Sequence, residues 1–155
     1  MFRFLTLSVA LLWCVTALGH HWVKDVYDDQ KRLIVEVEVK EFRLINPHPF
    51  MFVEIIGIPE GQGAHELAIG QTWTLEMDNR WELTDLGFDS ETFIPGDQIL
   101  VAVDPSRDNV YRDDTLYIRA IEHQRKGFVY VHNVRQLFPI ETAADNLAKH
   151  LPKAQ

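Results

Sequence analysis

Apolar and polar residues alternate along much of the chain, the pattern of β-strands that bury one face. The clearest run is residues 33–40, in which every second side chain is Leu or Val and most of the others are charged. Phe42 and Leu44 have the opposite parity to Val39, so the buried face changes near Lys40-Glu41. We therefore predict a long first strand that is interrupted by a β-bulge.

Five further segments are interpreted as strands, and residues typical of turns separate them. They are residues 50–58, 71–78, 98–103, 115–122 and 128–132. On the third of the six strands, Leu75 and Met77 are expected to face inward and Glu76 outward. Pro47 and Pro49 interrupt the chain between the first two strands, since proline cannot donate a backbone hydrogen bond.

A short helix is expected between the third and fourth strands. Asn79 suits the N-cap, Glu82 has the capping-box position, and Gly87 is a natural stop. The helix would plug one end of the sheet with Trp81, or with Leu83 and Leu86. Three strands, a helix and further strands are the order of a mainly β, small OB-like antiparallel barrel of five to six strands. A sandwich or meander is the alternative.

The first residues have the pattern of a secretory signal peptide. Arg3 gives a positive charge, and residues 5–18 are almost wholly apolar but too few for an ordinary membrane span. Cleavage is expected after Ala17 or Gly19. We divide the chain into a signal peptide (1–19), a barrel domain (20–135) and a partly helical C-terminal tail (136–155). The mature protein is expected to be periplasmic or secreted, without stable membrane insertion.

Composition narrows the function classes. The chain has 155 residues, enough for one domain, and its single cysteine, Cys14, lies in the signal. The mature chain would therefore lack disulfides and thiolate metal ligands. A formal net charge of −8 disfavours nucleic acid as a partner. The sequence has no nucleophile elbow, Walker loop, dinucleotide fingerprint or His-Glu-x-x-His motif, so we predict no catalytic residues and favour a non-enzyme.

Histidines give the strongest indication of chemistry. If the mature chain begins Leu18-Gly19-His20, its amine, two amides and an imidazole offer the square-planar nitrogen set that Cu(II) prefers. If it begins at His20, the amine and imidazole form a chelate that a second histidine such as His21 could complete. His48, in Asn46-Pro47-His48-Pro49, is a third ligand if the N-terminal segment folds back. The alternative for His48 is a corner residue whose ring bonds a backbone carbonyl.

Other polar and aromatic residues have structural interpretations. His123 and His132 lie in or near late strands and could pair across a sheet. The acidic and basic residues between Asp104 and Asp114 are better explained by internal salt bridges than by calcium. Three carboxylates are expected on solvated strand faces: Glu36, Glu38 and Glu54. Five aromatic residues are interpreted as core, with a ligand groove as the alternative: Trp22, Trp73, Trp81, Phe50 and Phe52.

A series of short motifs resembles the bacterial exported family catalogued as domain of unknown function 6152. They are His20-His21, Phe42 to His48, Trp73 to Glu76, Leu83 to Gly87, Pro95-Gly96-Asp97 and Pro105 to Asp108. The resemblance runs from about His20 to Ile121 and implies a small exported β-rich domain with no established activity. The chain departs from the family at Trp22, where serine is frequent, and at Leu44 or Ile45, where tryptophan is frequent. The tail after Lys126 is additional.

The leading hypothesis is thus a non-enzymatic binding domain that coordinates Cu(II) or a related metal through His20, His21 and His48. The rival is a metal-independent module that holds a protein or a small ligand. A metalloenzyme would need an open coordination position and a substrate groove, and the sequence indicates neither.

Overall fold

The computed structural model describes residues 23–60, 67–107, 114–132 and 137–139. The strands are β1 (Leu33–Arg43), β2 (Phe50–Gly57), β3 (Thr72–Glu76), β4 (Gln98–Pro105), β5 (Thr115–His123), β6 (Phe128–Val131) and β7 (Leu137–Pro139). The helical elements are α2 (Val23–Val26), the 3-10 turn η1 (Asp29–Lys31) and α3 (Arg80–Asp85). All six predicted strands and the predicted helix are confirmed, with ends shifted by a few residues. Within these ranges no helix is long and apolar enough to cross a membrane.

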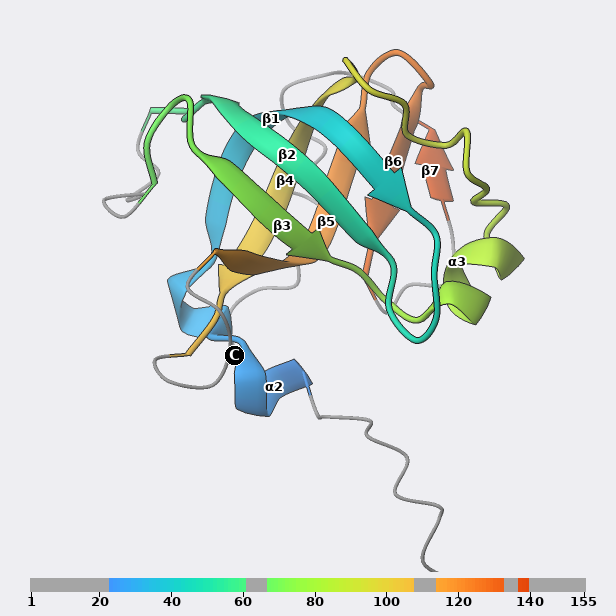
Figure 1. Ribbon diagram of the computed structural model, residues 1–155, viewed down its shortest axis with the longest axis horizontal. Helices are drawn as coiled ribbons and strands as arrows, with labels where there is room; N and C mark the ends of the chain where they lie inside the picture. The colour runs from blue at the N-terminus through green and yellow to red at the C-terminus, as the bar shows by residue number, and fades with distance from the viewer. Residues whose placement is uncertain (1–22, 61–66, 108–113, 133–136, 140–155) are drawn as a thin grey trace, which may run out of the picture.

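The first five strands close into a barrel (Figure 1). β1 pairs antiparallel with β2 on one edge and with β4 on the other. β2 also pairs with β3, and β4 with β5, while β3 and β5 close the ring in parallel. The predicted small barrel with a helix between its third and fourth strands is confirmed, and its predicted antiparallel pairing holds at every barrel pairing except that of β3 with β5. A closed ring with an odd number of strands cannot alternate in direction throughout, so one pairing has to be parallel.

The sheet continues beyond the barrel through β6 and β7. β6 pairs with the same edge of β5 as β3 does, because β3 occupies only part of that edge. β3 pairs with β5 at Thr115, Leu116 and Tyr117, whereas β6 pairs with it from Ala120 to His123. The two partners follow one another along the same edge of β5. The chain leaving β3 therefore passes close to β6, and this is where polar residues gather.

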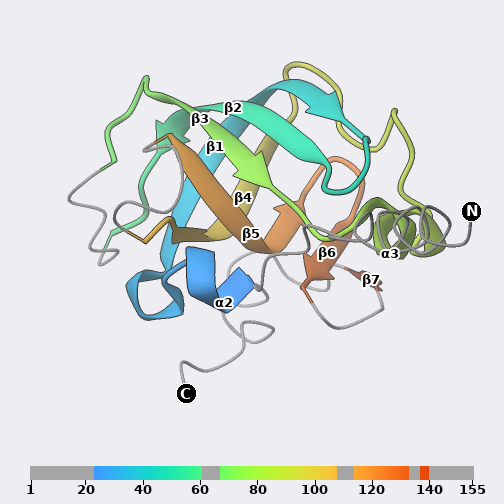
Figure 2. The same cartoon turned by 60° about the horizontal axis from the view of Figure 1, so that its bottom comes forward.

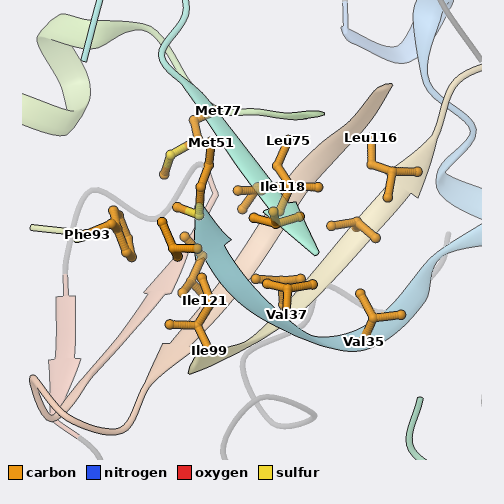
Figure 3. Close-up of a cluster of buried hydrophobic side chains, with 14 of the residues drawn as sticks. Val35, Val37, Met51, Leu75, Met77, Phe93, Ile99, Leu116, Ile118 and Ile121 are labelled. Carbon is orange, nitrogen blue, oxygen red and sulfur yellow. The ribbon is translucent and has the colours of Figure 1, made fainter. Parts of the chain in front are cut away.

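Inward-facing aliphatic side chains fill the barrel, as Figure 3 shows. Val35, Val37 and Val39 on β1 are fully buried, which confirms the predicted alternation. Full burial of a side chain of this size contributes roughly 1.5–3 kcal/mol. The register with β2 shifts after Val39, and Phe42 then packs against the core. The predicted bulge is therefore present, and it returns the apolar face to the barrel.

α3 closes one end of the barrel. The Asn79 side chain accepts a hydrogen bond from the Glu82 N–H at 3.0 Å, and Gly87 follows the helix with φ of 91°, so the predicted N-cap and stop are confirmed. Leu83 is fully buried, while Trp81 is 72% exposed. The end of the barrel is thus plugged by Leu83 and not by Trp81.

Candidate functional site

Two carboxylates are buried where the chain leaves β3. Glu76 alternates with the core residues Leu75 and Met77, so its side chain lies on the outer side of the barrel as predicted. It is nevertheless only 1% exposed. The Tyr27 hydroxyl, from the chain just after α2, donates to Glu76 Oε2 at 2.6 Å. Figure 2 shows α2 beside β5, where its apolar side packs near Tyr117.

His48 lies at the corner between β1 and β2 and contacts the end of β3. Its Nδ1 is 3.1 Å from the Met77 carbonyl oxygen and 3.6 Å from Glu76 Oε1. A carbonyl oxygen only accepts hydrogen bonds, so Nδ1 carries the hydrogen and the lone pair is on Nε2. The side chain is 7% exposed. A corner histidine bonded to a backbone carbonyl is therefore confirmed, and its tautomer leaves the ring lone pair on Nε2.

The corner is held against β3 by its own backbone. The Asn46–Pro47 peptide bond is cis. The Pro47 carbonyl accepts from the Arg80 N–H at 3.2 Å, and the Pro49 carbonyl accepts from the Met77 N–H at 3.0 Å. These two bonds flank His48 and fix the position of its ring. The prolines that interrupt the strands thus also place the His48 side chain.

Asp78 is the centre of a second buried group. It accepts from the Tyr117 hydroxyl at 3.1 Å, the Tyr130 hydroxyl at 2.7 Å and His132 Nδ1 at 2.6 Å. Burial opposes ionisation, but the hydrogen bond and charge of His132, followed by the tyrosine hydroxyls, hold the pKa of Asp78 below its ordinary value. Burial beside this carboxylate raises the pKa of both tyrosines well above 10. Asp78 is therefore an ionised acceptor surrounded by donors.

Asp104 forms a third buried group with two arginines. Arg32 Nε and Arg119 Nε donate to its carboxylate at 2.7 and 2.5 Å. The Arg119 guanidinium also lies 5.0 Å from the centre of the Tyr117 ring. Arg32 directly precedes β1 and Arg119 lies on β5, so neither arginine comes from the loop that follows Asp104. Asp104 thus forms its salt bridges with residues outside the charged loop. Residues 108–113 of that loop lie outside the described chain.

His123 and His132 do not pair with each other. His123 lies opposite Phe128, and the His132 N–H donates to the Arg119 carbonyl. His123 Nε2 instead lies 3.1 Å from Asp97 Oδ2. Each of these histidines thus has its own aspartate. Alternation could not reveal this, because Asp97 appears in the sequence only as a turn residue.

The Asp97 carboxylate is held by several donors. It accepts two hydrogen bonds from Arg125, at 2.7 and 2.8 Å, and one from the Ile94 N–H at 3.0 Å. Burial opposes the ionisation of Asp97, but the hydrogen bonds and nearby positive charge together outweigh this effect and lower the pKa of Asp97 to about 2. The group joins the turn before β4 to the hairpin between β5 and β6, which is a structural role.

The aromatic residues considered for a groove do not share one surface. Trp73 packs against the core, opposite the inward-facing Val53. Phe50 and Phe52 lie on the outer side of β2, where the Arg43 guanidinium is 4.9 Å from the Phe52 ring centre. Trp22 lies outside the described residues. Glu36 is exposed, and Glu38 and Glu54 are half-buried on the outer strand faces, as expected.

The described residues alone do not form a metal centre. Within 23–60, 67–107, 114–132 and 137–139, no three His, Cys, Asp or Glu side chains are placed to hold a metal ion. His20 and His21 precede the first described residue, Val23. His65 and His150 also lie outside these ranges. Of the three predicted ligands, the structure therefore places His48 only.

Comparison with known proteins gives one match. A family model described as a family of unknown function (DUF6152) matches residues 9–113. The matched region contains His48, Glu76 and Asp78 but ends before Tyr117, on β5, and His132, the residue after β6. No curated protein and no solved structure matches the chain.

Proposed function

The chain belongs to this family of unknown function, and we propose that its β-barrel is an exported binding domain for Cu(II) or a related late transition metal. The ligands are His20, His21, the terminal amine and His48. The observation that carries the proposal is the hydrogen bond from His48 Nδ1–H to the Met77 carbonyl oxygen. Metal-ligating histidines usually donate their second ring N–H to a carbonyl or carboxylate, which fixes the tautomer and ring orientation.

The contacts of Glu76 support a site shared by the N-terminal segment and the corner. One oxygen of this carboxylate accepts from Tyr27, and the other lies 3.6 Å from His48. Tyr27 follows His21 by only six positions. With about 1.5 Å per helical residue and about 3.3 Å per extended residue, this chain spans roughly 13 Å. So short a span supports a site that His20 and His21 share with the corner.

The chemistry of the ligand set favours copper. Imidazole, amine and deprotonated amide nitrogens suit the tetragonal geometry of Cu(II), and the chain offers no thiolate apart from Cys14. The negative charge of the protein attracts a cation. Binding requires neutral imidazoles, so the affinity is expected to fall as the pH drops below about 6.5.

Copper titration of the exported protein tests the proposal, after its intact mass has established the N-terminal residue. We expect one tight site, and at least a tenfold loss of affinity in His20→Ala and in His48→Asn. The asparagine amide can still donate to the Met77 carbonyl, so the corner is preserved. His150→Ala is the matched control and should bind as the natural protein does. Absence of a tight site, or binding that neither variant weakens, would rule the metal function out.

A second candidate is a metal-independent interaction module, and the exposure of Trp81 favours it. This side chain is 72% exposed on α3, whose first residue bonds to the Pro47 carbonyl. Tryptophan is enriched among the residues that dominate binding energy in protein interfaces. A partner that remains bound in the presence of a chelator and is lost in Trp81→Ala would favour this function over metal binding.

A further inference from the structure

A second apolar cluster lies on the outside of the barrel, on β4, β5 and β6. Ala102, Ala120 and Val131 lie side by side across the three strands. Val129 on β6 completes the cluster, and all four side chains are between 0% and 2% exposed. We call these four residues the outer apolar face. It is separate from the barrel core and from the groups around Glu76 and Asp78.

No described helix accounts for this burial. Ile34 and Leu100, which pack against the outer apolar face, belong to the same sheet. α2 packs near Tyr117 instead, and α3 lies at the end of the barrel. Side chains on the outer side of a sheet are exposed unless another segment lies over them. This leaves the part of the chain outside the described ranges as a source of cover.

The C-terminal segment, residues 140–155, has the length and the pattern to be that cover. Its apolar residues recur at spacings of three and four: Ile140, Ala143, Ala144, Leu147, Ala148 and Leu151. This is one face of an amphipathic helix. Thr142 suits the N-cap, and Pro152 would end the helix. About nine residues rise roughly 14 Å, which matches three strands spaced about 4.8 Å apart.

We propose that residues 143–151 of this segment form an amphipathic helix that packs across the outer apolar face with its Leu and Ala stripe. β7 pairs with β6 at the edge of the sheet, so the segment that follows β7 starts beside the strand that carries Val129 and Val131 (Figure 1). The small side chains of Ala102 and Ala120 let a helix approach the sheet closely. Docking covers apolar surface that would otherwise promote association between molecules.

A spin label on the segment tests the contact in the full-length chain. In a Cys14→Ser background, Asn146→Cys places the label on the polar side of the helix, away from the packing stripe. We expect the methyl signals of Val129 and Val131 to lose at least half their intensity, while those of the barrel-core residue Val35 change less. A sample that mixes spin-labelled molecules with separate isotope-labelled molecules should show no such loss.

Three outcomes would overturn the proposal. They are no loss of intensity, loss only in the mixed sample, which indicates a second copy, or loss caused by a label at Trp22→Cys instead, which indicates the N-terminal segment. A second measurement uses Leu147→Asp with Asn146→Asp as the charge-matched control. Leu147→Asp should at least double the fluorescence of a dye that binds exposed apolar surface, and the control should not. Equal fluorescence of the two folded variants would also contradict docking.

Discussion

Asp78 illustrates how one buried carboxylate can join three strands at the residue scale. It comes just after β3, and its donors are supplied by β5 and by β6 with the residue after it. Asp78 was not predicted as a site residue, because its partners are 39 to 54 positions away in the sequence. The bond of His48 to a backbone carbonyl could be predicted as a type of contact, because prolines on both sides mark a corner. The identity of that carbonyl, Met77, depends on the tertiary fold.

Asp78→Asn is expected to destabilise the fold. An amide has one accepting oxygen instead of two, and in a buried position its NH₂ group would face either the Tyr117 donor or the Tyr130 and His132 donors. Because hydrogen bonds to charged groups contribute about 1.5–3 kcal/mol each, we expect a loss of about 3 kcal/mol in the free energy of unfolding. Denaturant unfolding would measure it. Asp85→Asn, an exposed change on α3, should cost less than about 0.5 kcal/mol. Similar losses in the two variants would refute the central role of Asp78.

At the scale of elements, local sequence signals predicted the structure well where local interactions decide it. The alternation of Val35, Val37 and Val39, the bulge after Val39 and the ends of α3 are all present. The strand β7 was not predicted, since three residues that include Pro139 give no alternation. Its pairing with β6 depends on the neighbouring strand and not on its own sequence.

The N-cap of α3 gives a prediction at this scale. Asn79→Ala removes the acceptor for the Glu82 N–H and should lower the free energy of unfolding by about 1 kcal/mol. Asn79→Asp keeps a capping oxygen and should retain most of the stability. Denaturant unfolding of both variants would show the difference. If alanine and aspartate were equivalent here, the cap would not stabilise the helix.

At the scale of the whole molecule, the closure of the barrel decides which polar residues are buried. Glu76 faces away from the core, and periodicity alone places it in solvent. The parallel pairing of β3 with β5 and the packing of the chain after α2 cover it instead. Both contacts join distant parts of the sequence, so they could not be predicted from the local pattern. The burial of the candidate site therefore depends on closure of the barrel. His48 could be predicted from the sequence only because the prolines on both sides of it mark a corner.

Buried charges also make the stability of the whole fold depend on pH. Burial lowers the pKa of His123 below 6.5 and outweighs the opposing effect of Asp97, while Arg125 and Lys126 add to the decrease. The unfolded chain then binds a proton near pH 6.5 that the folded protein does not, so stability falls as the pH decreases below this value. Asp97, with its pKa lowered to about 2, gives stability that is present above about pH 4 and lost toward pH 2.

These directions predict a stepwise loss of stability in acid. The free energy of unfolding should decrease between pH 7 and pH 5 because of His123, and again below pH 4 because of Asp97. Glu122 acts in the opposite direction, since burial raises its pKa above 4.5 and favours the fold at lower pH. Denaturant unfolding at successive pH values would measure the profile. His123→Gln should flatten the decrease above pH 5, while His150→Gln should leave it. An unchanged slope in His123→Gln would show that this histidine does not set the acid sensitivity of the barrel.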